Sequence, residues 1–162
     1  MGAGDVVTLV HGMTERGLTL ACAESLTAGL LCATVADVPG SSAVLRGGVV
    51  VYATDLKATL ADVAEETLAA HGPVAAETAR ELAAGVRTRC GADWGVSLTG
   101  VAGPDPQDGH PVGEVWCGLA GPDGHARAVR LGIDPAAGRR GIREAAVAAA
   151  IGEVAAVALG AH

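Results

Sequence analysis

The spacing of apolar residues in the first part of the chain predicts a helix, a strand and a second helix. Residues 6–13 place valines and a methionine at helical spacing, and Gly17 then ends the pattern. The short apolar run at residues 18–23 predicts a strand. The helix that follows ends at the pair Pro39-Gly40, because these two residues are strong breakers of regular structure.

The middle of the chain is mostly helical. Residues 48–52 predict a second strand, and Thr54 can cap a helix that carries Lys57. Further helical patterns cover residues 63–70 and 74–89, and a Gly-Pro pair separates them. We therefore expect helices between the second strand and the third.

The last part of the chain predicts three more strands, at residues 94–98, 114–119 and 127–133. A Pro-Asp-Gly turn between the last two makes them an antiparallel hairpin. The Ala-rich stretch at residues 145–161 predicts a core-facing helix, since it carries a glutamate and follows three arginines, which disfavours a membrane span.

The order of these elements predicts the fold class. Strands that alternate with helices indicate a three-layer α/β/α fold, and the late hairpin makes its mostly parallel sheet mixed. A chain of 162 residues is the size of one domain, and we expect that domain to cover residues 1–162. Half of the residues are hydrophobic but only three are aromatic, so Val, Leu, Ile and Ala must fill the core.

Polar residues follow three of the predicted strands where small ligands of such sheets usually bind. Ser25 and Thr27 come after the first strand, Tyr52 and Thr54 stand at the end of the second, and Thr99 with Gly100 ends the third. Ligands of open α/β sheets bind beyond the carboxyl ends of the strands. The sequence therefore predicts one pocket formed by these three segments.

Lys57 and Tyr52 are the only lysine and the only tyrosine, and the other ten basic residues are arginines. A buried lysine can lose its proton, whereas an arginine keeps its charge. A serine needs a base before it can act as a nucleophile, so Lys57 is the natural partner of Ser25. The Tyr52 hydroxyl can hold the lysine amine in position or relay a proton.

The same residues have simpler interpretations. Ser25 or Thr27 can serve only as a helix cap, and Ser42 is an alternative nucleophile if a turn brings it near Lys57. Ser25 remains the first choice, because a helix start is the better site for a developing negative charge. The glycine-rich turns near Ser41 and after Gly100 are each weak signals for phosphate or oxyanion binding.

Charge and cysteine usage exclude several functional classes. A net charge of -7 disfavours binding to nucleic acid, which requires clustered basic residues. The four cysteines form no C-x-x-C pair and the histidines have no ligand-like spacing, so we expect free thiols, no metal, no cofactor and a cytoplasmic location. No export signal or lipid anchor is recognisable, and no membrane partner is expected.

Several motifs in one order identify a family that the chain resembles. It is similar to the carboxy-terminal domain of the CinA competence/damage-inducible family, also known as nicotinamide mononucleotide deamidase. The matching segments are Ala23-Glu24-Ser25-Leu26-Thr27-Ala28-Gly29, Gly40-Ser41-Ser42, Gly47-Gly48-Val49-Val50-Val51-Tyr52 with Lys57, Ser97-Leu98-Thr99-Gly100-Val101-Ala102-Gly103-Pro104, Pro111-Val112-Gly113-Glu114-Val115-Trp116, and Arg139 with Arg143.

The resemblance implies hydrolysis of the carboxamide of nicotinamide mononucleotide to nicotinic acid mononucleotide and ammonia, in pyridine-nucleotide recycling. Ser25 would attack the amide carbon, while Lys57 and Tyr52 would transfer protons. Thr27, Thr99 and Gly100 would position the substrate. The phosphate would be bound by Arg139 or Arg143, with Ser41 and Ser42 as further ligands.

The chain departs from the family pattern at a few positions. Ala28 stands where the family usually has a first glycine, and residues 105–107 replace the usual Gly pair. These changes affect loop shape more than the core chemistry. Many family members also carry an amino-terminal domain of molybdopterin-binding type, which this sequence does not contain, so the resemblance implies a stand-alone form.

The sequence also fits a function of another class. A catalytically silent nucleotide-binding or regulatory module would use the same pocket without turnover. A structural role in DNA uptake, which the family name suggests, is disfavoured by the acidic charge. Ala- and Gly-rich helices can pack closely against a second copy, so a homo-oligomer is expected.

Overall fold

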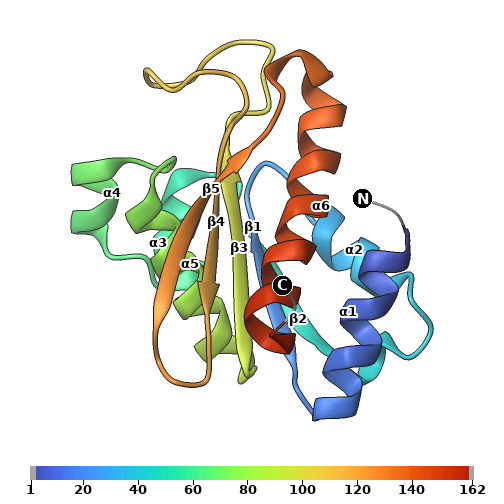
Figure 1. Cartoon of the computed structure of the whole chain (residues 1–162). Helices are drawn as coiled ribbons and strands as arrows, with labels where there is room; N and C mark the ends of the chain where they lie inside the picture. The colour runs from blue at the N-terminus through green and yellow to red at the C-terminus, as the bar shows by residue number, and fades with distance from the viewer. Residues whose placement is uncertain (1–2, 161–162) are drawn as a thin grey trace.

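A five-stranded sheet lies between two layers of helices (Figure 1). The computed structural model describes residues 3–160. The strands are β1 (Leu20–Glu24), β2 (Leu45–Val50), β3 (Trp94–Gly100), β4 (Glu114–Ala120) and β5 (Ala126–Gly132), in the spatial order β2-β1-β3-β4-β5. β1 pairs parallel with β2 and β3, and the pairs of β3 with β4 and of β4 with β5 are antiparallel. The predicted fold class, with its late hairpin, is confirmed.

The helices divide between the two faces of the sheet. One face is covered by α1 (Ala3–Arg16), α2 (Leu30–Ala36) and α6 (Gly138–Leu159), and the other by α3 (Thr54–Ala61), α4 (Glu65–His71) and α5 (Ala76–Cys90) (Figure 1). Two short 3₁₀ helices, η1 (Ser41–Ala43) and η2 (Pro135–Ala137), precede β2 and α6. No helix within residues 3–160 has the length and apolar character needed to cross a membrane.

Aliphatic side chains form the core, as the composition predicts. The larger cluster lies under α1, α2 and α6 and includes Leu9, Met13, Leu98 and Ile151, all at most 2% exposed. A smaller cluster, built mainly from alanine and valine, lies under α3 and α5. The smaller side chains of the second cluster allow closer contact between its helices and the sheet.

Glycines permit close contact between the sheet and α5, and between α5 and α3. A side chain at Gly118 of β4 would collide with the carbonyl of Ala79 in α5. A side chain at Gly85 of α5 would collide with the carbonyl of Ala61 at the end of α3. The sheet therefore fixes α5, and α5 in turn fixes α3, the helix that carries Lys57.

Two predicted helix caps are wrong. The N-cap of α3 is Ala53, which makes no side-chain cap bond, and Thr54 is the first residue of the helix. Neither Ser25 nor Thr27 caps α2, because α2 begins only at Leu30. The buried Glu24 carboxylate accepts from the first turn of α2 instead, since a negative charge suits the free N–H groups there.

Candidate active site

A pocket lies at the carboxyl ends of β1, β2 and β3, where the sequence predicts it. Its walls contain Ser25 after β1, Tyr52 after β2, and Thr99 with Gly100 at the end of β3. Because β1 lies between β2 and β3 and runs parallel to both, the three strand ends meet at one edge of the sheet. The cavity measures about 140 Å³, which is smaller than the roughly 300–1,000 Å³ of typical ligand pockets. A nucleotide would therefore extend beyond it.

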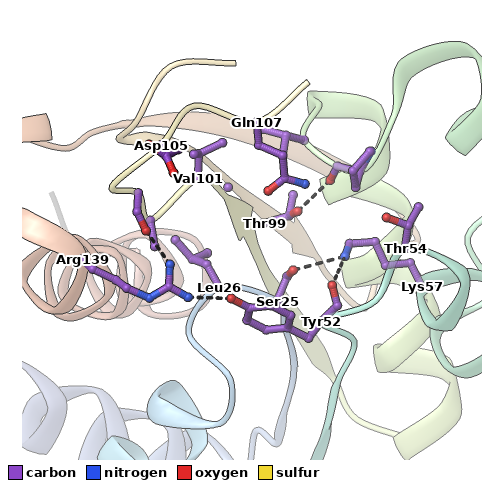
Figure 2. Close-up of a pocket in the computed structure, with 15 residues that line it drawn as sticks. Ser25, Leu26, Tyr52, Thr54, Lys57, Thr99, Val101, Asp105, Gln107 and Arg139 are labelled. Carbon is purple, nitrogen blue, oxygen red and sulfur yellow. Dashed lines mark hydrogen bonds between the residues drawn. The ribbon is translucent and has the colours of Figure 1, made fainter. Parts of the chain in front are cut away.

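Ser25 and Lys57 point toward each other inside this pocket (Figure 2). Lys57 Nζ donates to Ser25 Oγ at 3.1 Å. The amine also donates to the Val51 carbonyl at 2.8 Å and to the Tyr52 carbonyl at 3.5 Å. Lys57 is only 1% exposed and Ser25 8% exposed. The serine hydroxyl and two main-chain carbonyls therefore hold the amine inside the pocket, away from bulk water.

Burial changes the acidity of this lysine. The loss of water around Nζ lowers the pKa of Lys57 from 10.5 to about 8. Within residues 3–160 no carboxylate forms an ion pair with Lys57 that would oppose this effect. With that pKa, roughly one molecule in ten carries a neutral amine at pH 7. The neutral amine can accept the Ser25 proton.

Tyr52 contributes to the site in another way than the sequence predicts. Its hydroxyl accepts from Arg139 of α6 at 2.7 Å, and Arg139 also donates to the Gly103 carbonyl. The hydrogen bond between Lys57 and Tyr52 is made by the Tyr52 main-chain carbonyl. The Tyr52 side chain is 54% exposed and lies with Arg139 at the rim of the pocket (Figure 2).

The main chain holds Ser25 and Thr99 in place. The Ser25 N–H donates to the Leu98 carbonyl at 2.9 Å and so continues the pairing of β1 with β3. This N–H is therefore not available for an oxyanion. The Thr99 hydroxyl donates to the Pro73 carbonyl at 2.7 Å, which joins the end of β3 to the loop before α5.

Four residues that the sequence predicts for substrate binding lie outside the pocket lining: Thr27, Ser41, Ser42 and Arg143. Thr27 is fully buried, and its hydroxyl has no hydrogen-bond partner within the described part of the chain. Arg143 donates to two main-chain carbonyls next to Ser25. Ser41 and Ser42 lie in η1, before the amino end of β2, whereas the pocket lies beyond its carboxyl end.

The structure also brings residues to the pocket that the sequence did not identify. Asp105 and Gln107 line it from the loop between β3 and β4 (Figure 2). Thr54, which the sequence does predict at this edge, lines it from the first turn of α3. Pro73 and Val74 complete the wall before α5. The sequence contained one signal that could have predicted the loop residues. The loop after β3 begins at the same edge of the sheet as Ser25, and ligand-binding loops gather at that edge.

Comparison with known proteins agrees with the fold and the motifs. The model of the CinA C-terminal domain matches residues 6–158. A CinA-like protein of Frankia casuarinae is 52% identical over 140 residues, which is 86% of this chain and 31% of the relative. A putative competence-damage inducible protein of Halothermothrix orenii is 47% identical over 120 residues, which is 74% of this chain and 29% of the relative. The chain thus spans about a third of these relatives.

Solved structures with the same fold cover nearly the whole chain. The competence/damage inducible protein CihA from Agrobacterium tumefaciens superposes with a TM-score of 0.88 at 33% identity, covering 98% of this chain and 97% of its own. A competence or damage-inducible protein from Enterobacter asburiae gives a TM-score of 0.90 at 26% identity, with 97% and 98% covered.

Proposed function

The chain belongs to the CinA C-terminal domain family, and on that premise we propose that it hydrolyses the carboxamide of nicotinamide mononucleotide. The products are nicotinic acid mononucleotide and ammonia. The contact of 3.1 Å between Lys57 Nζ and Ser25 Oγ carries this proposal, because it pairs a nucleophile with a base of lowered pKa. The substrate itself is the one that the family resemblance implies.

In the first step Ser25 Oγ attacks the amide carbon while neutral Lys57 takes the hydroxyl proton. The carbonyl oxygen becomes negative and needs a donor near Ser25. The Leu26 N–H is a candidate, because within residues 3–160 it donates to no other group and Leu26 lines the pocket. The Lys57 ammonium then protonates the leaving nitrogen, and ammonia departs from an acyl-serine.

In the second step water hydrolyses the acyl-serine. Lys57, neutral again after giving its proton to ammonia, accepts a proton from the water that attacks the acyl carbon. The same proton returns to Ser25 Oγ when the nicotinic acid product leaves. Overall one amide and one water give one carboxylic acid and one ammonia, and the enzyme is restored.

Arg139 is the proposed ligand for the phosphate. It stands at the rim of a pocket too small for a whole nucleotide, so the charged end of the substrate would lie outside, near this guanidinium. A planar guanidinium can bind a phosphate through two parallel hydrogen bonds. Arg139 is held by the Tyr52 hydroxyl and the Gly103 carbonyl, which keeps it at the rim.

The test is formation of ammonia and nicotinic acid mononucleotide from nicotinamide mononucleotide with a chelator present. We expect turnover by the native protein and a loss on the order of 10³-fold or more in Ser25→Ala. Turnover that survives in Ser25→Ala would move the nucleophile elsewhere. A folded protein that binds the nucleotide but yields no product would favour a silent nucleotide-binding or regulatory module.

A further inference from the structure

The segment that carries the proposed nucleophile has an unfavourable main-chain conformation. Residues 25–29, here called the Ser25 turn, contain Ala28 at φ 50° and Gly29 at φ 99°. An alanine in the left-handed region costs roughly 1–2 kcal/mol. Such a conformation persists only when surrounding contacts determine it. The contacts that hold the Ser25 turn therefore bear on where Ser25 Oγ lies.

Arg143 holds the turn from the side of α6. Its Nε donates to the Leu26 carbonyl at 2.8 Å, and a terminal nitrogen donates to the Thr27 carbonyl at 3.2 Å. These are charge-assisted hydrogen bonds, which are about twice as strong as neutral ones. They reach the carbonyls of the two residues that directly follow Ser25, so α6 fixes the first half of the turn.

Glu24 holds the other end of the turn. Its carboxylate, 1% exposed, accepts from the Leu31 N–H at 2.7 Å and from the Cys32 N–H at 3.0 Å. Glu24 immediately precedes Ser25, whereas the two N–H groups follow the turn. The carboxylate thus ties the start of the Ser25 turn to its exit into α2.

We propose that Arg143 and Glu24 are positioning residues that hold Ser25 Oγ within reach of Lys57, and that Arg143 does not bind the substrate phosphate. This inference rests on the proposed function for its kinetic consequences. A displacement of the nucleophile by about 1 Å can lower a rate by about 100-fold. Loss of the Arg143 or the Glu24 side chain lets the strained turn relax and moves the Ser25 hydroxyl away from Lys57 Nζ.

Two neighbouring arginines of α6 supply matched controls. Arg139 lines the pocket and is the proposed phosphate ligand. Arg140 lies at the exposed surface and pairs with Glu144 at 2.6 Å. Each can be changed to glutamine with the same loss of charge from the same helix. Differences among the three variants therefore report the position of each side chain and not the change of charge.

The kinetic experiment compares Arg143→Gln, Arg139→Gln and Arg140→Gln on two substrates, nicotinamide mononucleotide and its nucleoside without phosphate. For Arg143→Gln we expect kcat to fall about 10- to 100-fold, and by the same factor on both substrates. The KM should stay within about twofold of the native value. Arg140→Gln should match the native protein. A rise of KM confined to the phosphorylated substrate in Arg143→Gln would overturn the assignment and make Arg143 a phosphate ligand.

A second measurement does not need turnover. Hydrogen–deuterium exchange of residues 25–32 should become faster in both Arg143→Gln and Glu24→Gln. The first variant loses charge-assisted bonds to the turn, and the second loses those to the start of α2, where the turn ends. Exchange in β4 and α5 should stay unchanged, which separates a local effect from general unfolding. Unchanged exchange of the turn in both variants would refute the inference even if the protein proves to be an amidase. Faster exchange in a protein without any amidase activity would refute the proposed function alone.

Discussion

Polar residues flank both ends of β2, but the two ends have different surroundings. Before β2, Ser41 and Ser42 lie at the surface in a short 3₁₀ helix, and the Ser41 hydroxyl donates to the Ala36 carbonyl at 3.3 Å. After β2, Tyr52 and Lys57 meet Ser25 in the pocket. A strand of six residues separates the two ends. Serines in a glycine-rich motif are therefore not enough for a site; they must lie at the edge of the sheet where the neighbouring strands also end.

Lys57→Met should have the largest effect at the carboxyl end of β2. Without a base beside Ser25 we expect kcat/KM for amide hydrolysis to fall on the order of 10³-fold. The same variant should be more stable, although it is less active. Its free energy of unfolding, measured with urea at pH 7, should be about 2 kcal/mol higher, because a buried charge is removed. The hydrogen bonds lost with the amine offset part of this gain.

The stability effect of Lys57→Met depends on pH with a defined sign. Burial lowers the folded-state pKa of Lys57 to about 8 from 10.5, so the folded protein disfavours the charged amine. The penalty is full below pH 8 and disappears as the pH rises to about 10.5. The advantage of the variant should shrink over that window. Equal stability of both proteins at every pH would mean that Lys57 is solvated. A separate variant, Lys57→Arg, keeps the charge but removes the base, so unaltered turnover in it would contradict the role of Lys57 as a base.

The pH dependence of the native enzyme should show the next largest effect. Only the neutral amine can accept the Ser25 proton, so kcat/KM should rise about tenfold for each pH unit below the Lys57 pKa and level off above about 8. Initial rates of ammonia release between pH 5.5 and about 9.5 would measure this. A flat profile across pH 7 to 9 would contradict proton transfer to Lys57.

The sequence was sufficient for the parts of the site that depend on strand order. Ser25 and Tyr52 follow strands and Thr99 lies at the end of one, and parallel neighbours bring such residues to one edge. Lys57 was found because it is the only lysine, and its depth in the pocket follows from the contact of α3 with α5. The fold class followed from the same alternation of elements.

Other parts depend on side-chain direction, which the sequence does not contain. Arg139 and Arg143 lie four residues apart on one face of α6, about one turn from each other. That single turn places Arg139 at the pocket and directs Arg143 to the carbonyls behind Ser25. Ser25 and Thr27 were candidate caps because hydroxyls commonly cap helices, but a buried glutamate at position 24 already serves α2.

Ser42→Ala should have the smallest effect, because it changes the other end of β2. The side chain is exposed in η1 and lies outside the pocket lining, so kcat and KM for nicotinamide mononucleotide should stay within about twofold of the native values. Thermal unfolding should also be unchanged within about 0.5 kcal/mol. A tenfold loss of kcat with unchanged stability would break the comparison between the two ends. Because β2 is an edge strand, a second copy bound along it could bring another η1 to the pocket. Light scattering at micromolar concentration, which tests the expected homo-oligomer directly, would then separate a shared site from an effect within one chain.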